Sequence, residues 1–99
     1  MEFIYVLKLI PRLFKEENWT AEDENFVTAH FERLKTFRDQ GTVILAGRTL
    51  NEEEHAFGIV VFEAENEEEA EEFMKEDPAV KNGIMTGELY PYRVALLKE

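Results

Sequence analysis

The sequence predicts an α+β fold with the ferredoxin-like element order β-α-β-β-α-β, in which two helices cover one face of a four-stranded antiparallel sheet. Four segments rich in β-branched and aromatic residues and two segments with helical periodicity follow one another in that order. With 99 residues, 44% of them hydrophobic, the chain is long enough for one hydrophobic core. We therefore expect a single domain over residues 1–99.

The first predicted strand covers residues 2–10 and is apolar on both faces. The two faces are formed by Phe3, Tyr5, Leu7 and Leu9 and by Ile4, Val6 and Ile10. Two helices can cover only one face of the sheet, so the open face needs another cover. We expect a homodimer that packs sheet against sheet. Pro11 ends the strand, and a loop is expected up to residue 19.

The first predicted helix begins after Thr20, whose hydroxyl suits the N-cap position. Glu22 and Asp23 follow in its first turn, where acidic residues are favoured by the helix dipole. The helical pattern continues to about Gln40, and Gly41 is typical of the residue that follows a helix.

Residues 42–47 and 57–64 are the second and third predicted strands. The residues between them are polar and acidic, which indicates a hairpin with a long, solvated tip.

The second predicted helix begins after Asn66, because Asn66 and Glu69 have the spacing of a capping box. Its buried face is marked by Ala70, Phe73 and Met74. Pro78 prevents the helix from continuing. Residues 88–97 are the fourth predicted strand, and Pro91 within it indicates an edge of the sheet or a bulge.

Charge and hydropathy exclude several classes of partner. The chain has 22 acidic and 11 basic residues, with a formal net charge of −11, which would repel a nucleic-acid backbone. The longest apolar stretch, residues 3–10, is too short to span a bilayer and contains Lys8. No signal peptide is recognisable. We expect a cytoplasmic protein without nucleic-acid or membrane partners.

His30 is the residue of the first helix that does not fit its pattern. The apolar stripe of this helix consists of Phe26, Val27, Phe31, Leu34 and Phe37. At about 100° per residue, His30 lies about 40° from Phe26 and therefore inside this stripe. A core histidine bonded to a backbone carbonyl is one explanation, and one half of an acid–base pair is the other.

Asp77 is the best candidate for the partner of His30, because it lies at a helix exit that Pro78 makes rigid. Next to His30, its carboxylate would accept the Nδ1 proton and fix the tautomer, leaving Nε2 to act as acid or base. A solvated turn residue is the alternative, since Asp-Pro is a common turn dipeptide.

The chain also contains three stretches, FIYVLKLI at 3–10, HFERLKTFRDQGTVILAG at 30–47 and FEAENEEEAEEFMKEDPAV at 62–80. Their order and spacing resemble the YciI-like (YCII-related) family of small dimeric α+β barrel proteins. The resemblance implies a His–Asp dyad at the edge of a pocket between sheet and helix, formed here by His30 and Asp77. It also implies acid–base chemistry, such as proton transfer or elimination, on small and often aromatic molecules.

Arg48 departs from the family pattern, which commonly has proline after the Ala-Gly pair that ends at Gly47. At the pocket rim it would bind a substrate carboxylate or phenolate, unless it only balances the acidic residues beside it. Tyr5 and Tyr92, on strands expected to be neighbours, are candidates for lining the pocket, with core packing as the alternative. Trp19 either closes the pocket mouth or serves as a hydrophobic staple.

These residues support three functions. The first is a cofactor-independent acid–base enzyme of the lyase or isomerase type, acting through His30 and Asp77 on a small aromatic or carboxylate-bearing molecule. The second is a non-catalytic module that binds a small ligand or regulates as a dimer. The third is an oxygenase or haem-handling protein with His30 as an axial ligand. No metal ion is expected, because cysteine is absent and neither His30 nor His55 belongs to a metal-binding motif.

Overall fold

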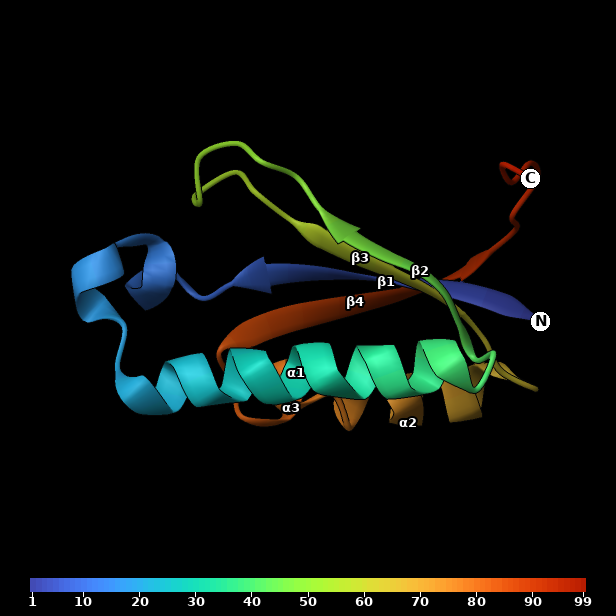
Figure 1. Cartoon of the computed structure of the whole chain (residues 1–99), viewed down its shortest axis with the longest axis horizontal. Coiled ribbons are helices and arrows are strands. Elements are labelled where there is room, and N and C mark those ends of the chain that lie inside the picture. Colours follow the sequence, from blue (N-terminus) through green and yellow to red (C-terminus); the bar gives the residue numbers. More distant parts are fainter.

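The computed structural model describes residues 1–99 and has the predicted ferredoxin-like α+β architecture. Four antiparallel strands form one sheet in the order β2-β3-β1-β4. The strands are β1 (Glu2–Leu9), β2 (Val43–Arg48), β3 (Gly58–Glu63) and β4 (Met85–Tyr92). The helices α1 (Ala21–Asp39), α2 (Glu67–Lys75) and α3 (Pro78–Lys81) lie together under one face of the sheet (Figure 1).

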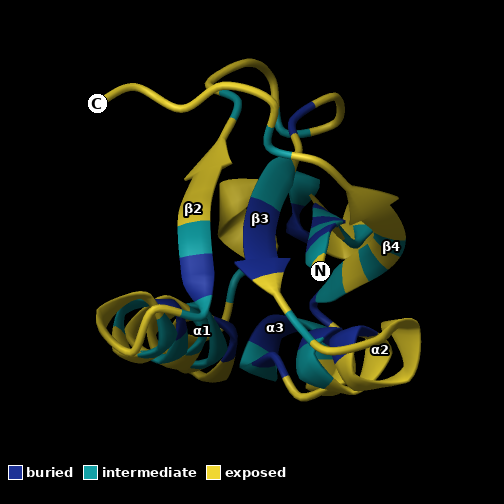
Figure 2. Cartoon of the chain, turned by 90° about the vertical axis from the view of Figure 1, so that its right-hand side faces the viewer, coloured by how far each residue is buried: buried dark blue, intermediate teal, exposed yellow.

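The hydrophobic core lies between the sheet and the helices. Phe3 and Tyr5 of β1 are fully buried, and the strand register sets Phe62 opposite Phe3 and Val60 opposite Tyr5 on the same face. Phe73 of α2 stacks on Phe62, with 4.6 Å between the ring centroids. Figure 2 shows buried residues gathered between the sheet and the helices. β1 is an inner strand that pairs with β3 on one side and with β4 on the other.

The start of α1 is fixed by a capping box that confirms Thr20 as the N-cap. The Thr20 hydroxyl accepts from the Asp23 amide at 3.1 Å, and the Asp23 carboxylate accepts from the Thr20 amide at 2.9 Å. Arg12 donates two bonds of 2.9 Å to the same carboxylate, and together these donors hold the pKa of Asp23 well below its usual range. Arg12 belongs to a 3-10 turn, Pro11–Phe14, in the segment predicted to be a loop. This segment is thereby fastened to the beginning of α1.

Asn66 caps α2 as predicted, since its side chain accepts from the Glu69 amide at 2.8 Å. Pro78 lies beyond the end of α2 and begins α3, a short helix that was not predicted from the sequence. Proline suits the first position of a helix because its missing amide hydrogen needs no partner there.

The predicted boundaries of the fourth strand, 88–97, are wrong at both ends. The strand begins at Met85 and ends at Tyr92. Tyr92 pairs with Glu2, the first residue of β1, so residues after Tyr92 have no partner on β1. Residues 93–99 leave the sheet and pass over its face away from the helices (Figure 2). Pro91 lies on an edge strand, as predicted.

The face of the sheet away from the helices carries apolar side chains that remain accessible. Five large apolar residues on this face, or on the segment that crosses it, are exposed: Leu45, Tyr90, Tyr92, Leu96 and Leu97. No helix of the chain combines the length and the apolar character that crossing a bilayer requires.

Candidate functional site

Asp77 occupies the junction between α2 and α3 with its side chain fully buried. Its backbone is extended (φ −60°, ψ 125°), as expected before a proline, and its carboxylate caps α3 by accepting from the Ala79 amide at 2.9 Å. The Asp-Pro-Ala sequence therefore places a carboxylate at a helix start and under the sheet.

The structure brings His30 and Asp77 together. His30 projects from the middle of α1, and its Nδ1 lies 2.7 Å from Oδ1 and 2.8 Å from Oδ2 of Asp77. Because a carboxylate only accepts, Nδ1 carries a proton and the neutral imidazole has its lone pair on Nε2. The His30 side chain is 12% exposed and lines a cavity, so the ring is positioned to meet a bound molecule.

Tyr5 lies behind this pair rather than in the cavity. Its side chain is fully buried, it is not among the cavity-lining residues, and its hydroxyl donates to Oδ2 of Asp77 at 2.6 Å. The structure thus gives Tyr5 a place different from the one expected for a substrate-binding residue. It orients the carboxylate that orients His30.

The electrostatics of the site favour an ionised Asp77. Burial acts to raise the pKa of Asp77, but hydrogen bonds from His30, Tyr5 and the Ala79 amide outweigh it and lower the pKa below its usual value. Burial also raises the pKa of the Tyr5 hydroxyl, and the neighbouring Asp77 charge raises it further. Tyr5 therefore remains a neutral donor to a charged acceptor.

Arg33 lies beside this network and was not among the residues predicted from the sequence. Its guanidinium lies over the rings of Phe73 (4.4 Å) and Phe37 (5.0 Å) and donates to the Phe73 carbonyl at 3.0 Å. Its buried Nη1 has no hydrogen-bond partner, and its charge partly offsets the rise in the Tyr5 pKa. Three residues after His30 on α1, Arg33 also lies at the edge of the apolar stripe, and that signal was available in the sequence.

Tyr5→Phe is expected to change how stability depends on pH. The substitution removes a hydrogen bond to a buried carboxylate, which should lower the free energy of unfolding by about 1.5–3 kcal/mol at pH 8. Above pH about 10 the unfolded tyrosine loses its proton while folded Tyr5 keeps it, so this contribution falls by about 1.4 kcal/mol per pH unit. Urea unfolding at pH 8–11 therefore should show the two proteins converging as pH rises.

Tyr92→Phe is the matched control, because Tyr92 is exposed at the end of β4. It should unfold like the wild type throughout this range. A constant difference between Tyr5→Phe and the wild type from pH 8 to 11 would contradict a neutral Tyr5 bonded to Asp77.

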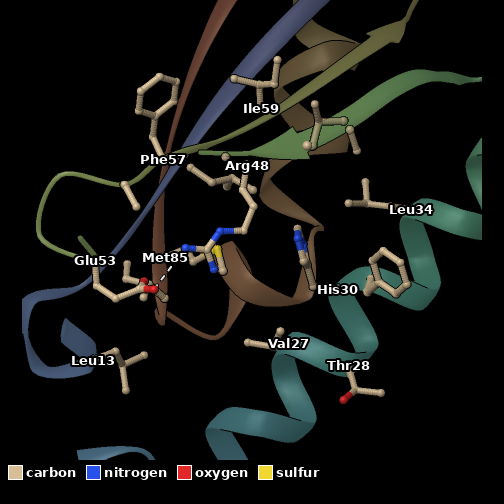
Figure 3. Close-up of a pocket in the computed structure, with 18 of the residues that line it drawn as sticks. Leu13, Val27, Thr28, His30, Leu34, Arg48, Glu53, Phe57, Ile59 and Met85 are labelled. Carbon is tan, nitrogen blue, oxygen red and sulfur yellow. Dashed lines mark hydrogen bonds and ion pairs between the residues drawn. The ribbon is translucent and has the colours of Figure 1, made fainter. Parts of the chain in front are cut away.

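A cavity of about 900 Å³ opens in front of His30, between the sheet, α1, the 3-10 segment and the β2–β3 hairpin. Of its 22 lining residues, 14 are hydrophobic, and they come from elements far apart in the sequence. The apolar walls include Leu7, Leu9, Leu13, Phe14, Trp19, Val27, Phe31, Leu34, Phe57 and Met85. Figure 3 shows His30 from α1 and Arg48 from β2 both directed into this space.

Arg48 lines the cavity and is also paired with an acidic neighbour. Its Nη2 donates to Oε1 of Glu53 at 3.0 Å, and its Nε donates to the Thr49 carbonyl at 3.0 Å. Arg48 therefore has both features that were considered as alternatives from the sequence: it lies at the cavity, and it is paired with an acidic residue.

Other residues considered from the sequence lie outside the pair. His55 is exposed on the hairpin, and Tyr92 is on the opposite face of the sheet.

Trp19 lines the cavity, with its Nε1 donating to the Leu13 carbonyl at 3.0 Å. Phe31, which belongs to the predicted apolar stripe, lines the cavity and is 58% exposed. No group of three or more histidine and acidic side chains is placed to hold a metal ion.

Comparisons with known proteins give two findings. The family model of the YCII-related domain matches residues 4–92. Among solved structures, the chain is similar to 5-chloro-2-hydroxyhydroquinone dehydrochlorinase from Burkholderia phenoliruptrix AC1100 in complex with 2,5-dihydroxybenzoquinone, with a TM-score of 0.69, 18% identity and 94% of each chain covered. At this identity the likeness establishes the fold. No curated protein matches the chain.

Proposed function

This chain belongs to the YCII-related domain family, and we propose that it is a cofactor-independent acid–base enzyme of the lyase or isomerase type. The observation that carries the proposal is the imidazole of His30, held at Nδ1 by a buried carboxylate and lining a largely apolar cavity. An imidazole held in this way offers Nε2 to a bound molecule as a proton acceptor or, once protonated, as a donor.

The proposed substrate is a small molecule with a hydroxylated aromatic or quinoid ring. The cavity has the size of small-molecule sites, and 14 of its 22 lining residues are hydrophobic, with several aromatic side chains among them. The structurally similar dehydrochlorinase acts on a chlorinated hydroxyhydroquinone, which gives this ring class further support. In an elimination His30 takes a proton as a leaving group departs from a neighbouring atom. In an isomerisation it returns the proton elsewhere on the same molecule.

The residues behind His30 support this chemistry electrostatically. When Nε2 takes a proton, the imidazole becomes positively charged, and the ionised Asp77 at 2.7 Å stabilises that charge. Tyr5 fixes the carboxylate through its 2.6 Å hydrogen bond. The positive charge that develops on the imidazole is therefore stabilised without any movement of the groups around it.

The test is an assay of the purified chain on 5-chloro-2-hydroxyhydroquinone, hydroquinone and 4-hydroxybenzoate. Halide release reports elimination, and exchange of ring hydrogen for deuterium in D2O, followed by NMR, reports proton abstraction. We expect at least one compound to react about 100-fold faster than in buffer. If these compounds bind without release or exchange, and with the same affinity to His30→Gln, the non-catalytic binding module is the better description.

We also propose that two copies associate through the face of the sheet away from the helices. Apolar side chains on this face, among them Leu45 and Tyr90, are 47% exposed in the single chain. Sedimentation velocity should give the mass of a dimer, and Leu45→Glu should shift it toward that of a monomer. A monomer at all concentrations of the wild type contradicts the proposal.

A further inference from the structure

Arg48 is the only lysine or arginine among the residues that line the cavity. Three acidic residues, Glu16, Glu24 and Glu53, line the same space. The whole chain also has a net charge of −11. An anionic ligand is therefore repelled from most of this cavity and has one place where a permanent positive charge can receive it.

The position of Arg48 is set by the end of β2. In the β2–β3 register it lies opposite Gly58, which has no side chain to cover the arginine stem. The Nε group donates to the Thr49 carbonyl, which leaves the two terminal nitrogens of the guanidinium for other acceptors. This pair of nitrogens suits a carboxylate that binds through two parallel N–H···O bonds.

Glu53 meets this guanidinium only through one oxygen, Oε1, at 3.0 Å. The Arg48 side chain is 54% exposed and that of Glu53 is 39% exposed, and an ion pair so open to water contributes little free energy. The hairpin backbone stays closed without it, since the Thr49 amide donates to the Phe57 carbonyl and the Phe57 amide to the Thr49 hydroxyl. The Glu53 side chain can therefore turn into solvent while the hairpin keeps its shape.

We infer that Arg48 is the anion-binding residue of the cavity and that Glu53 competes for it, so that the substrate is an aromatic acid whose carboxylate displaces Glu53. His30 and Arg48 project into the cavity from opposite walls, α1 and β2, so one ring can present its carboxylate to Arg48 and another substituent to His30 (Figure 3). The aromatic part of this inference rests on the proposed function, whereas the anion site rests on the Arg48–Glu53 geometry alone.

The inference is tested by equilibrium binding of two probes with the same ring, 4-hydroxybenzoate and the neutral 4-hydroxybenzamide. Calorimetry gives Kd for the wild type, Glu53→Gln, Arg48→Met and Glu24→Gln. Glu53→Gln should bind the acid about three- to fivefold more tightly, because the competitor is removed. Arg48→Met should bind the acid at least about tenfold more weakly. Neither substitution should change the affinity for the amide more than about twofold.

Glu24→Gln is the matched control, since it removes the same charge from the cavity wall without touching Arg48. Its effect on the acid should be less than half that of Glu53→Gln. Equal effects of the two substitutions overturn the inference, because they would mean that the acid responds only to the total negative charge of the cavity wall. Tighter binding of benzylamine than of either probe, weakened by Glu53→Gln, also overturns it and makes the cavity a cation site.

These outcomes are separable from the fate of the proposed function. If Arg48 and Glu53 change the affinity for the acid as expected but no exchange or elimination is seen, the anion site is supported and the proposed enzymatic function is contradicted. If neutral rings are turned over by a reaction that depends on His30 but Arg48 and Glu53 do not change the affinity for the acid, the enzymatic function is supported and the anion site is contradicted.

Discussion

Asp77→Asn is expected to lower turnover by about 10²- to 10⁴-fold and the free energy of unfolding by about 2–4 kcal/mol. Three donors meet this buried carboxylate, namely the Tyr5 hydroxyl at 2.6 Å, His30 Nδ1 at 2.7 Å and the Ala79 amide at 2.9 Å. Asparagine replaces one accepting oxygen by an NH2 group, which only donates. At least one of the three donors then loses its acceptor or has to reverse its role.

The imidazole and the Tyr5 hydroxyl can each reverse their role, whereas the Ala79 amide cannot. If Nδ1 accepts from the new NH2 group, the proton moves to Nε2, and the atom facing the substrate is no longer a base. NMR should then show the His30 ring in the other tautomer. Retention of the Nδ1–H tautomer together with wild-type turnover in Asp77→Asn contradicts the dyad.

The stability difference between the wild type and Asp77→Asn should depend on pH in one direction. The hydrogen-bonded carboxyl has a lowered pKa in the folded protein, so its contribution is fully present above the unfolded pKa of about 3.9. The contribution is lost as pH falls through the folded pKa. Urea unfolding at pH 7, 5 and 3 should show the difference shrinking only at the lowest pH. Asp39→Asn, at an exposed position at the end of α1, should cost less than about 0.5 kcal/mol at every pH.

The sequence was sufficient for elements whose boundaries depend on local chemistry. The Thr20 cap, the Gly41 stop and the extended backbone at Asp77 all follow from bonds or φ/ψ preferences within a few residues. The end of β4 does not, because it is set by where β1 begins, and the two strands meet only in the folded sheet.

The site divides in the same way. His30 and Asp77 could be nominated because each breaks or terminates a local pattern, although their distance required the structure. The bond from Tyr5 to Asp77 joins residues 72 positions apart, and Tyr5 is indistinguishable from a core aromatic residue in its strand. The pairing of Arg48 with Glu53 depends on the hairpin tip, where no repeating pattern fixes which acidic residue turns inward.

His30→Ala is expected to reduce turnover by about 10²- to 10⁴-fold and to be partly rescued by added imidazole. The substitution removes the base but leaves Asp77 bonded to Tyr5 and to the Ala79 amide, so two of its three donors still orient the carboxyl group. The space left by the ring joins a cavity that is open to solvent and large enough to admit imidazole together with a small substrate. Turnover should therefore rise with imidazole concentration and saturate.

Rescue distinguishes a base from a residue that only supports the fold. Imidazole bound in the vacated space should be oriented by Asp77, so the double variant with His30→Ala and Asp77→Asn should respond to it at least about tenfold less. His55→Ala, at an exposed histidine on the hairpin, should keep wild-type turnover and show no response. If His30→Ala retains full turnover, His30 is not the base. If imidazole restores the double variant as well as the single one, Asp77 does not orient the base, because the dyad requires both residues.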